Sequence, residues 1–253
     1  EWVLTTRRWT LMAWYFLSAG LILGGQWAYE ELGWGGFWAW DPVENAALMP
    51  WLTGTAFLHS VMIQEKRNML RIWNVVLIIT TFGLTIIGTF LTRSGIINSV
   101  HSFTQSEIGP AFLVYLALVL IAGFALLFKR IQMLESEYKI ESVLCRENVF
   151  LAQNILLVGI AFTVLLGTTF PLLAEAVRGT KLSIQAPFFN TITAPMGYAL
   201  LILMGVGMLI SWRRSSLDNL RRNFLRPLII ATLGTLFLFW ILFEKTMQWG
   251  VYI

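Results

Sequence analysis

Long apolar runs alternate with short polar and charged segments along the whole chain of 253 residues. The hydrocarbon core of a bilayer is about 30 Å thick, and a helix needs about 20 mostly apolar residues to cross it. Runs of about this length predict transmembrane helices over residues 9–29, 46–64, 72–92, 110–128, 149–172, 193–212 and 227–247. The pattern therefore predicts an all-α integral membrane protein, built as a polytopic bundle of about seven transmembrane helices.

The composition agrees with a membrane protein. Hydrophobic residues make up 57% of the chain and charged residues 13%, whereas about a quarter of the residues in a soluble domain are charged. We therefore expect a single transmembrane domain over residues 1–253, with residues 34–45 in an outer loop. The first apolar run is followed by further spans, so it is not only a cleaved signal. The chain opens on Glu1 without an initiator methionine, and we expect it to be the central part of a longer protein.

The distribution of lysine and arginine predicts the orientation, because cytoplasmic loops carry an excess of these residues. If the N-terminus is cytoplasmic, 14 of the 18 basic residues fall on the cytoplasmic side. These are Arg7, Arg8, Lys66, Arg67, Arg71, Lys129, Arg130, Lys139, Arg146, Arg213, Arg214, Arg221, Arg222 and Arg226. Arg93, Arg178, Lys181 and Lys245 fall on the other side. The net charge of +4 is then a signal of topology, and no nucleic-acid partner is needed to explain it.

The outer loop at 34–45 reads WGGFWAWDPVEN, and its second half predicts a helix start. Asp41 is a typical N-cap residue, Pro42 suits the first helical position, and Glu44 is placed to complete a capping box.

The first half of this loop has no such simple explanation. Trp34, Trp38 and Trp40 stand close together, and Gly35 and Gly36 lie between them. Tryptophans at this depth can form an interfacial aromatic belt. Glycine also lets another molecule approach the backbone closely, which favours a platform for a flat apolar ligand. The residues alone leave both interpretations open.

The two histidines and the one cysteine are the other candidates for chemistry. His59 falls inside the second span, where an ionisable residue is a functional candidate; it is either a neutral histidine bonded to a neighbouring helix or an axial haem ligand. His101 falls in the outer loop after the third span, on the same side as the tryptophans, and is either a surface residue or part of a site beside them. Cys145 falls in a cytoplasmic loop and has no CxxC partner, so the chain is not itself a dithiol oxidoreductase.

Two further loops complete the picture. The charges of loop 129–148 alternate at helical spacing, which predicts a solvated surface helix. The loop at 178–190 ends in APFFN and is a third outer segment in which a site could lie.

The segment WGGFWAWDPVEN resembles the tryptophan-rich WWD signature of haem-handling membrane proteins. The longer run from WDPVENAALMPWLTGTAFLHSVMIQEKR through GTFLTRSGIINSVHSF resembles the CcmF family, and the likeness continues through FLAQNILLVGIAFTVLLGTTFPLLAE and APFFN. The WWD signature alone is shared with CcmC and CcsA. The flanking runs narrow the resemblance to CcmF or to its relative NrfE, which serves a nitrite reductase.

The resemblance implies cytochrome c biogenesis at the bacterial inner membrane. A CcmF-type haem lyase holds a b-type haem in the membrane and receives a second haem, as substrate, on a WWD segment at the periplasmic side. It attaches the second haem to the CxxCH thiols of an apocytochrome c. The implied partners are CcmH- and CcmI-type subunits, haem-loaded CcmE, the apocytochrome and membrane lipid.

The resemblance also assigns roles to residues. His59 matches a ligand of the membrane haem iron, and His101 matches a ligand of the outer haem iron. The histidine that pairs with His101 is expected before Glu1, and the histidine that pairs with His59 is expected beyond Ile253. The haem-binding residues implied in this chain are Trp34, Gly35, Gly36, Trp38, Trp40, Asp41, His59 and His101.

Two other classes of function compete with this one. A transporter would need ionisable or polar groups at mid-membrane and broken helices, and the spans offer only the ionisable His59 and the polar Asn154 for the first requirement. A non-catalytic, haem-binding anchor subunit would explain a buried haem and an aromatic belt, but not the glycine-separated tryptophans.

The orientation gives a first prediction. Single cysteines placed at positions 101 and 139, in a chain that carries Cys145→Ser, should react differently with a membrane-impermeant maleimide on intact cells. Position 101 should be labelled and position 139 protected until the membrane is broken, because they lie on opposite sides. The reverse pattern would contradict the orientation.

Overall fold

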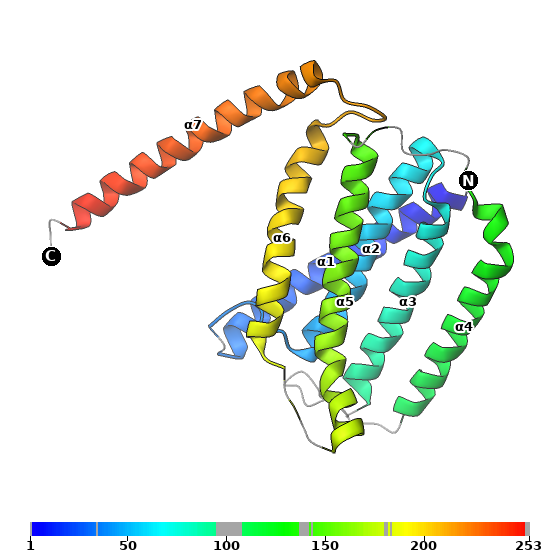
Figure 1. Ribbon diagram of the computed structural model, residues 1–253. Coiled ribbons are helices and arrows are strands. Elements are labelled where there is room, and N and C mark those ends of the chain that lie inside the picture. The colour runs from blue at the N-terminus through cyan, green and yellow to red at the C-terminus, as the bar shows by residue number, and fades with distance from the viewer. Residues whose placement is uncertain are drawn as a thin grey trace. The chain divides into compact units, whose positions relative to one another are not determined.

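The computed structural model describes residues 2–33, 35–94, 108–136, 142, 144–179, 182 and 184–250. All secondary structure in these residues is α-helical, as predicted (Figure 1). The helices are α1 Trp2–Glu31, α2 Pro42–Arg67, α3 Arg71–Arg93, α4 Gly109–Leu134, α5 Arg146–Arg178, α6 Ala186–Leu209 and α7 Leu217–Gly250. Each of the expected spans therefore falls largely within a helix.

The chain is a multi-pass membrane protein. Six helices of the described residues are long and apolar enough to cross a bilayer, namely α2 to α6 and the part of α7 from Asp218 to Phe243. α1 covers the expected span 9–29 but is not among these six helices. Bulky apolar side chains of α4, such as Leu118 and Ile121, are more than 60% exposed. A surface this apolar suits contact with lipid or with other membrane helices.

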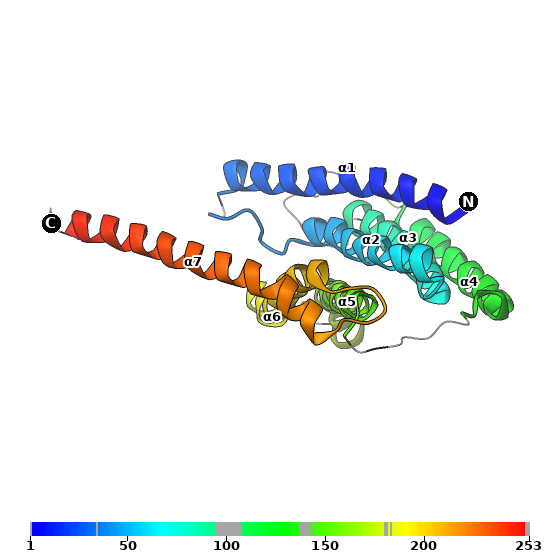
Figure 2. The ribbon, with the colours of Figure 1, turned by 90° about the horizontal axis from the view of Figure 1, so that it is seen from above.

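The contacts within the chain divide it into two compact units. The first contains residues 1–139 and 150–203, and the second contains residues 140–149 and 204–253. In the first unit α1 packs on α2, α2 on α3 and α3 on α4, and Figure 2 shows α1 lying alongside this row. α2 is the most enclosed of the candidate spans.

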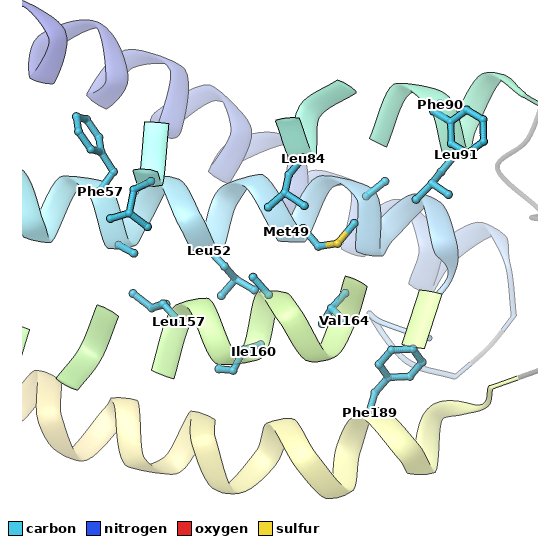
Figure 3. Packing of buried hydrophobic residues seen from close by; sticks show 14 of the residues in the cluster. Met49, Leu52, Phe57, Leu84, Phe90, Leu91, Leu157, Ile160, Val164 and Phe189 are labelled. Atoms are coloured by element: carbon cyan, nitrogen blue, oxygen red, sulfur yellow. The ribbon is translucent and has the colours of Figure 1, made fainter. Parts of the chain in front are cut away.

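The core of the first unit surrounds α2. Met49 and Leu52 of α2 are almost completely buried. Figure 3 shows the labelled residues of α2 between those of α3 and those of α5. The neighbours on α3 are Leu84, Phe90 and Leu91, and those on α5 are Leu157, Ile160 and Val164. Everything attached to the start of α2 is therefore held by the best-packed helix of this unit.

Small and polar residues bring α2 and α3 together, as is typical of membrane helices. Thr81 donates a hydrogen bond to Thr53 across the interface, with 2.8 Å between the hydroxyl oxygens. At Gly88, an added Cβ would lie 3.1 Å from the carbonyl oxygen of Ala46. This contact places the end of α3 beside the start of α2.

Polar contacts join the opposite ends of these helices. Arg7 near the start of α1 forms an ion pair with Glu65 near the end of α2. The hydroxyl of Ser136, just after α4, donates to the carbonyl of Asn68, which follows α2. The basic residues assigned to the cytoplasm near the start of α1, at the end of α2 and at the end of α4 therefore share one end of the bundle.

The second unit has its own polar contacts. Arg146 at the start of α5 donates to the carbonyl oxygens of Ile210 and Met208, and Glu147 accepts from the backbone N–H of Arg213. The surface helix predicted for residues 129–148 lies partly outside the described residues. Its described ends belong to α4 and α5 instead.

The contact at Gly88 gives a prediction about stability. Gly88→Val would push a side chain against the backbone of α2, and such overpacking costs about 1–3 kcal/mol. The matched change Gly20→Val introduces the same residue in α1, where nothing lies within 4 Å of an added Cβ. Thermal unfolding in detergent should show a lower Tm for Gly88→Val only. Equal Tm values would mean that the close approach of α2 and α3 is wrong.

Candidate functional site

The site begins at the N-terminus of α2, where the capping box predicted from the sequence is confirmed. The Asp41 carboxylate accepts from the N–H of Val43 at 3.0 Å. The Glu44 carboxylate accepts from the N–H of Asp41 at 3.2 Å and from the N–H of Ala39 at 3.1 Å. Two carboxylates therefore satisfy backbone donors on both sides of the helix start, and they fix the direction in which residues 35–40 leave α2.

The backbone of this segment adopts left-handed conformations at Gly35, where φ is 70°, and at Trp40, where φ is 60°. The left-handed region is ordinary for glycine but costly for a bulky residue. The conformation of Trp40 is supported from α2, because the Asn45 amide donates to the Trp40 carbonyl at 3.0 Å. Asn45 is buried and also donates to the Thr168 hydroxyl of α5 at 3.0 Å.

The side chain of Trp40 packs on the first turns of α6. Its ring stacks on Phe189, with 4.9 Å between ring centroids and 11° between planes. Its indole N–H donates to the Asn190 side-chain oxygen at 2.8 Å. Trp40 is therefore tied to α6 at both its ring face and its polar edge.

The contacts with Phe189 and Asn190 were not foreseen, because the sequence placed APFFN in a loop before the span 193–212. The structure corrects this prediction: α6 begins at Ala186. Pro187 suits the first turn of a helix, where a missing N–H costs nothing. The Pro-Phe-Phe run was the available signal, since it extends the apolar run of the span toward its N-terminus.

Trp38 occupies a different setting from Trp40. Its ring meets Trp40 edge-to-face, with 6.0 Å between centroids and 88° between planes. It also borders an apolar pocket of about 280 Å³ between α1 and α2. The other lining residues are Ser18, Leu21, Ile22, Leu48 and Trp51. The buried indole nitrogen of Trp38 has no hydrogen-bond partner among the described residues.

The glycines beside Trp38 leave the backbone open. An added Cβ at Gly35 or Gly36 would meet nothing within 4 Å. Phe37, next along the chain, stacks on Tyr29 of α1 with 4.6 Å between ring centroids. The segment is therefore held at Phe37 and Trp40. Its backbone is open at Gly35 and Gly36, which precede these two residues in the chain.

His59 lies in the membrane-spanning part of α2 and stacks on Phe150 of α5, with 5.4 Å between ring centroids and 18° between planes. Its Nδ1 atom is buried without a hydrogen-bond partner among the described residues, as are Ser60 Oγ and both side-chain polar atoms of Asn154. A neutral histidine bonded to a neighbouring helix through Nδ1 is therefore not what the structure shows. The ligation of a haem iron by His59 stays a prediction.

Trp34 and His101 lie outside the described residues. The helices that flank His101 are described: α3 ends at Arg93 and α4 begins at Gly109. An added Cβ at Gly109 would lie 3.1 Å from the Cβ of Ser94, so these two ends meet. Through the contact of Gly88 with Ala46, they share the end of the bundle with the start of α2.

No group of three or more histidine, cysteine, aspartate or glutamate residues is placed to hold a metal ion within the described part of the chain. Cys145 is 1% exposed, and burial raises the pKa of its thiol. A protonated, enclosed thiol is a poor nucleophile.

Comparisons with known proteins agree with the sequence pattern. The model of the family described as "Cytochrome C assembly protein" matches residues 1–97. The cytochrome c-type biogenesis protein ccl1 of Rhodobacter capsulatus is 44% identical over 95% of this chain and 37% of its own length. CcmF of Escherichia coli is 41% identical over 97% of this chain and 38% of its own. NrfE of Haemophilus influenzae is 40% identical over 84% of this chain and 33% of its own.

A solved structure gives the same result. The chain matches a structure titled "Cytochrome c Heme Lyase CcmF" with a TM-score of 0.72 and 43% identity, over 94% of this chain and 35% of the other. The chain thus spans about a third of the length of the relatives that it matches. With this likeness along nearly its whole length, the chain belongs to the CcmF type of the cytochrome c assembly proteins.

Proposed function

We propose that this chain takes part in cytochrome c biogenesis, as the portion of a haem lyase that receives haem on the segment 34–45 for attachment to apocytochrome c. The observation that carries the proposal is an open, glycine-containing backbone followed by Trp38, which borders an apolar pocket, in a segment fixed to a capped helix start. A porphyrin is flat and mostly apolar, so it suits such a surface. The names of the relatives, cytochrome c-type biogenesis proteins and a haem lyase, support the same function.

In this proposal the chain binds and orients, and the thiols belong to the substrate. Each thioether forms when a CxxCH thiol adds across a haem vinyl group, so that the sulfur bonds to one carbon and the hydrogen to the other. Trp38 and the backbone at Gly35 and Gly36 hold the porphyrin, together with Trp34. His101 is the axial ligand that this chain offers to the outer iron. Asp41 does not contact the porphyrin in this proposal; it caps α2 and so fixes the direction of the segment that precedes the helix.

The proposal includes a second haem, of b type, held in the membrane by His59. The buried and unpaired Nδ1 atom and the flat contact with Phe150 support it. Neutral imidazole is a common axial ligand of haem iron, and such a haem would supply one-electron redox chemistry when bound. The second axial ligand is expected from a histidine outside residues 1–253.

The same proposal sets the location and the partners. The segment 34–45 and His101 face the periplasm of a bacterium, and the basic ends of the helices face the cytoplasm, in accord with the distribution of lysine and arginine. The proposed partners are haem-loaded CcmE, CcmH- and CcmI-type subunits, and the apocytochrome.

Loss of Trp38 should reduce haem capture at the outer site. In the intact protein, Trp38→Ala removes a large apolar face beside the pocket, so less haem should be retained and transferred to apocytochrome. Trp9→Ala is the matched control, because Trp9 is 69% exposed on α1 and far along the helix from the segment. Haem transfer by Trp38→Ala equal to that of Trp9→Ala would rule out the proposed platform.

Asp41 should behave differently from Trp38. Asp41→Ala removes an N-cap and should cost about 1 kcal/mol of stability. Asp41→Asn keeps a capping oxygen and should restore most of that loss. Haem transfer and thermal unfolding, measured on both variants, separate the two roles. A stability loss in Asp41→Asn as large as in Asp41→Ala would contradict the capping role.

His59 should control the membrane haem. His59→Ala in the intact protein should remove or shift a low-spin b-type absorption spectrum, whereas Ser60→Ala, at the neighbouring buried position, should leave it unchanged. His101→Ala should keep this spectrum and impair haem attachment. An unaltered spectrum and haem content in His59→Ala would show that the ligand is assigned to the wrong residue.

A further inference from the structure

The start of α6 carries an aromatic ring in a fixed position. The Phe189 ring is 2% exposed and lies against Gly167 of α5, where an added Cβ would be 2.5 Å from the ring. Only glycine leaves room for Phe189 in this place. Trp40 stacks on a face of the same ring. Phe189 is therefore in contact with both the backbone of α5 at Gly167 and the ring of Trp40.

Three contacts hold Trp40 from two helices, α2 and α6, and a third helix, α5, supports one of them. Phe189 and Asn190 of α6 hold its side chain, by stacking and by the hydrogen bond to the indole N–H. Asn45 of α2 holds its carbonyl oxygen, and Asn45 is itself fixed to Thr168 of α5. We call Asn45, Phe189 and Asn190 the Trp40 bracket.

The bracket acts on a residue that would not hold its conformation unaided. The left-handed φ of Trp40 is unfavourable for a bulky side chain, and such a conformation persists only where the surroundings impose it. Trp38 contacts the edge of the Trp40 ring. A shift of Trp40 would therefore move the aromatic face that borders the pocket.

We propose that Phe189 and Asn190 are positioning residues for the outer haem site. They do not touch haem; they hold Trp40, and through Trp40 they set the orientation of Trp38. This inference rests on the proposed function, because it assigns a purpose to the geometry of the haem-binding segment. It also makes a structural claim that can be tested without haem.

The test compares Asn190→Leu, Asn190→Asp and Thr191→Val. Leucine removes the acceptor for the Trp40 indole, and aspartate keeps an acceptor oxygen. Thr191 is the matched control: it is the next residue of α6 and is exposed, and its one side-chain hydrogen bond to a described residue is to the carbonyl of Pro187 in its own helix. Phe189→Leu keeps an apolar side chain but removes the stacked ring.

The first measurement is made without haem. A cysteine at position 36, where a side chain meets nothing within 4 Å, reports the freedom of the segment by its rate of reaction with a maleimide. Asn190→Leu should raise this rate about two- to tenfold, the effect of one lost hydrogen bond, and Phe189→Leu should raise it at least as much. Asn190→Asp and Thr191→Val should react like the unchanged protein.

The second measurement is haem transfer to apocytochrome, without the added cysteine. Asn190→Leu and Phe189→Leu should transfer less haem, Asn190→Asp should recover, and the membrane haem spectrum should persist in all of them. If the labelling rate and the haem transfer are unchanged in both Asn190→Leu and Phe189→Leu, the positioning role of the bracket is wrong. The same conclusion holds if these variants have a lower Tm but an unchanged labelling rate and unchanged haem transfer. Normal haem transfer by Trp38→Ala would instead contradict the proposed function. In that case the labelling rates alone would show whether Phe189 and Asn190 hold Trp40 in place.

Discussion

The absence of water from the bilayer core is the constraint on which this structure depends. Backbone N–H and C=O groups in that region must be satisfied within the chain, so irregular backbone is confined to the ends of helices or to enclosed sites. The tryptophan segment meets this condition at the N-terminus of α2, where Asp41 and Glu44 accept from its free N–H groups. Because α2 is also the centre of the core, the segment is irregular in conformation yet attached to the most enclosed helix.

The helices and the cap could be predicted from the sequence because both depend on local patterns. Apolar runs of membrane length set the spans, and Asp41 and Glu44 stand at the fixed spacing of a capping box. The contact of Trp40 with Asn190 joins residues 150 positions apart, and no local pattern encodes it. The early start of α6 was missed because aromatic residues after a proline suit a loop and a helix equally well. Trp34 and His101 remain predictions, since they lie outside the described residues.

Neither an aromatic belt nor a ligand platform describes all the aromatic residues of the segment 34–45. Phe37 and Trp40 are occupied by stacking partners within the protein, on Tyr29 and Phe189. Trp38 borders a pocket and has an indole nitrogen without a partner among the described residues. Residues of one type in one short segment therefore have different tasks, some holding the segment and others forming its open surface. Only three-dimensional contacts distinguish them, because the tasks depend on what each ring faces.

The fit of Phe189 against Gly167 also restricts how the chain can change over evolutionary time. An alanine at position 167 would collide with the ring, so it could be inherited only with a smaller residue at position 189. A smaller residue there would leave the face of Trp40 uncovered, so the acceptable residues at position 40 would change as well. Positions 40, 167 and 189 should therefore change together, so that a substitution at one of them is accompanied by substitutions at the other two.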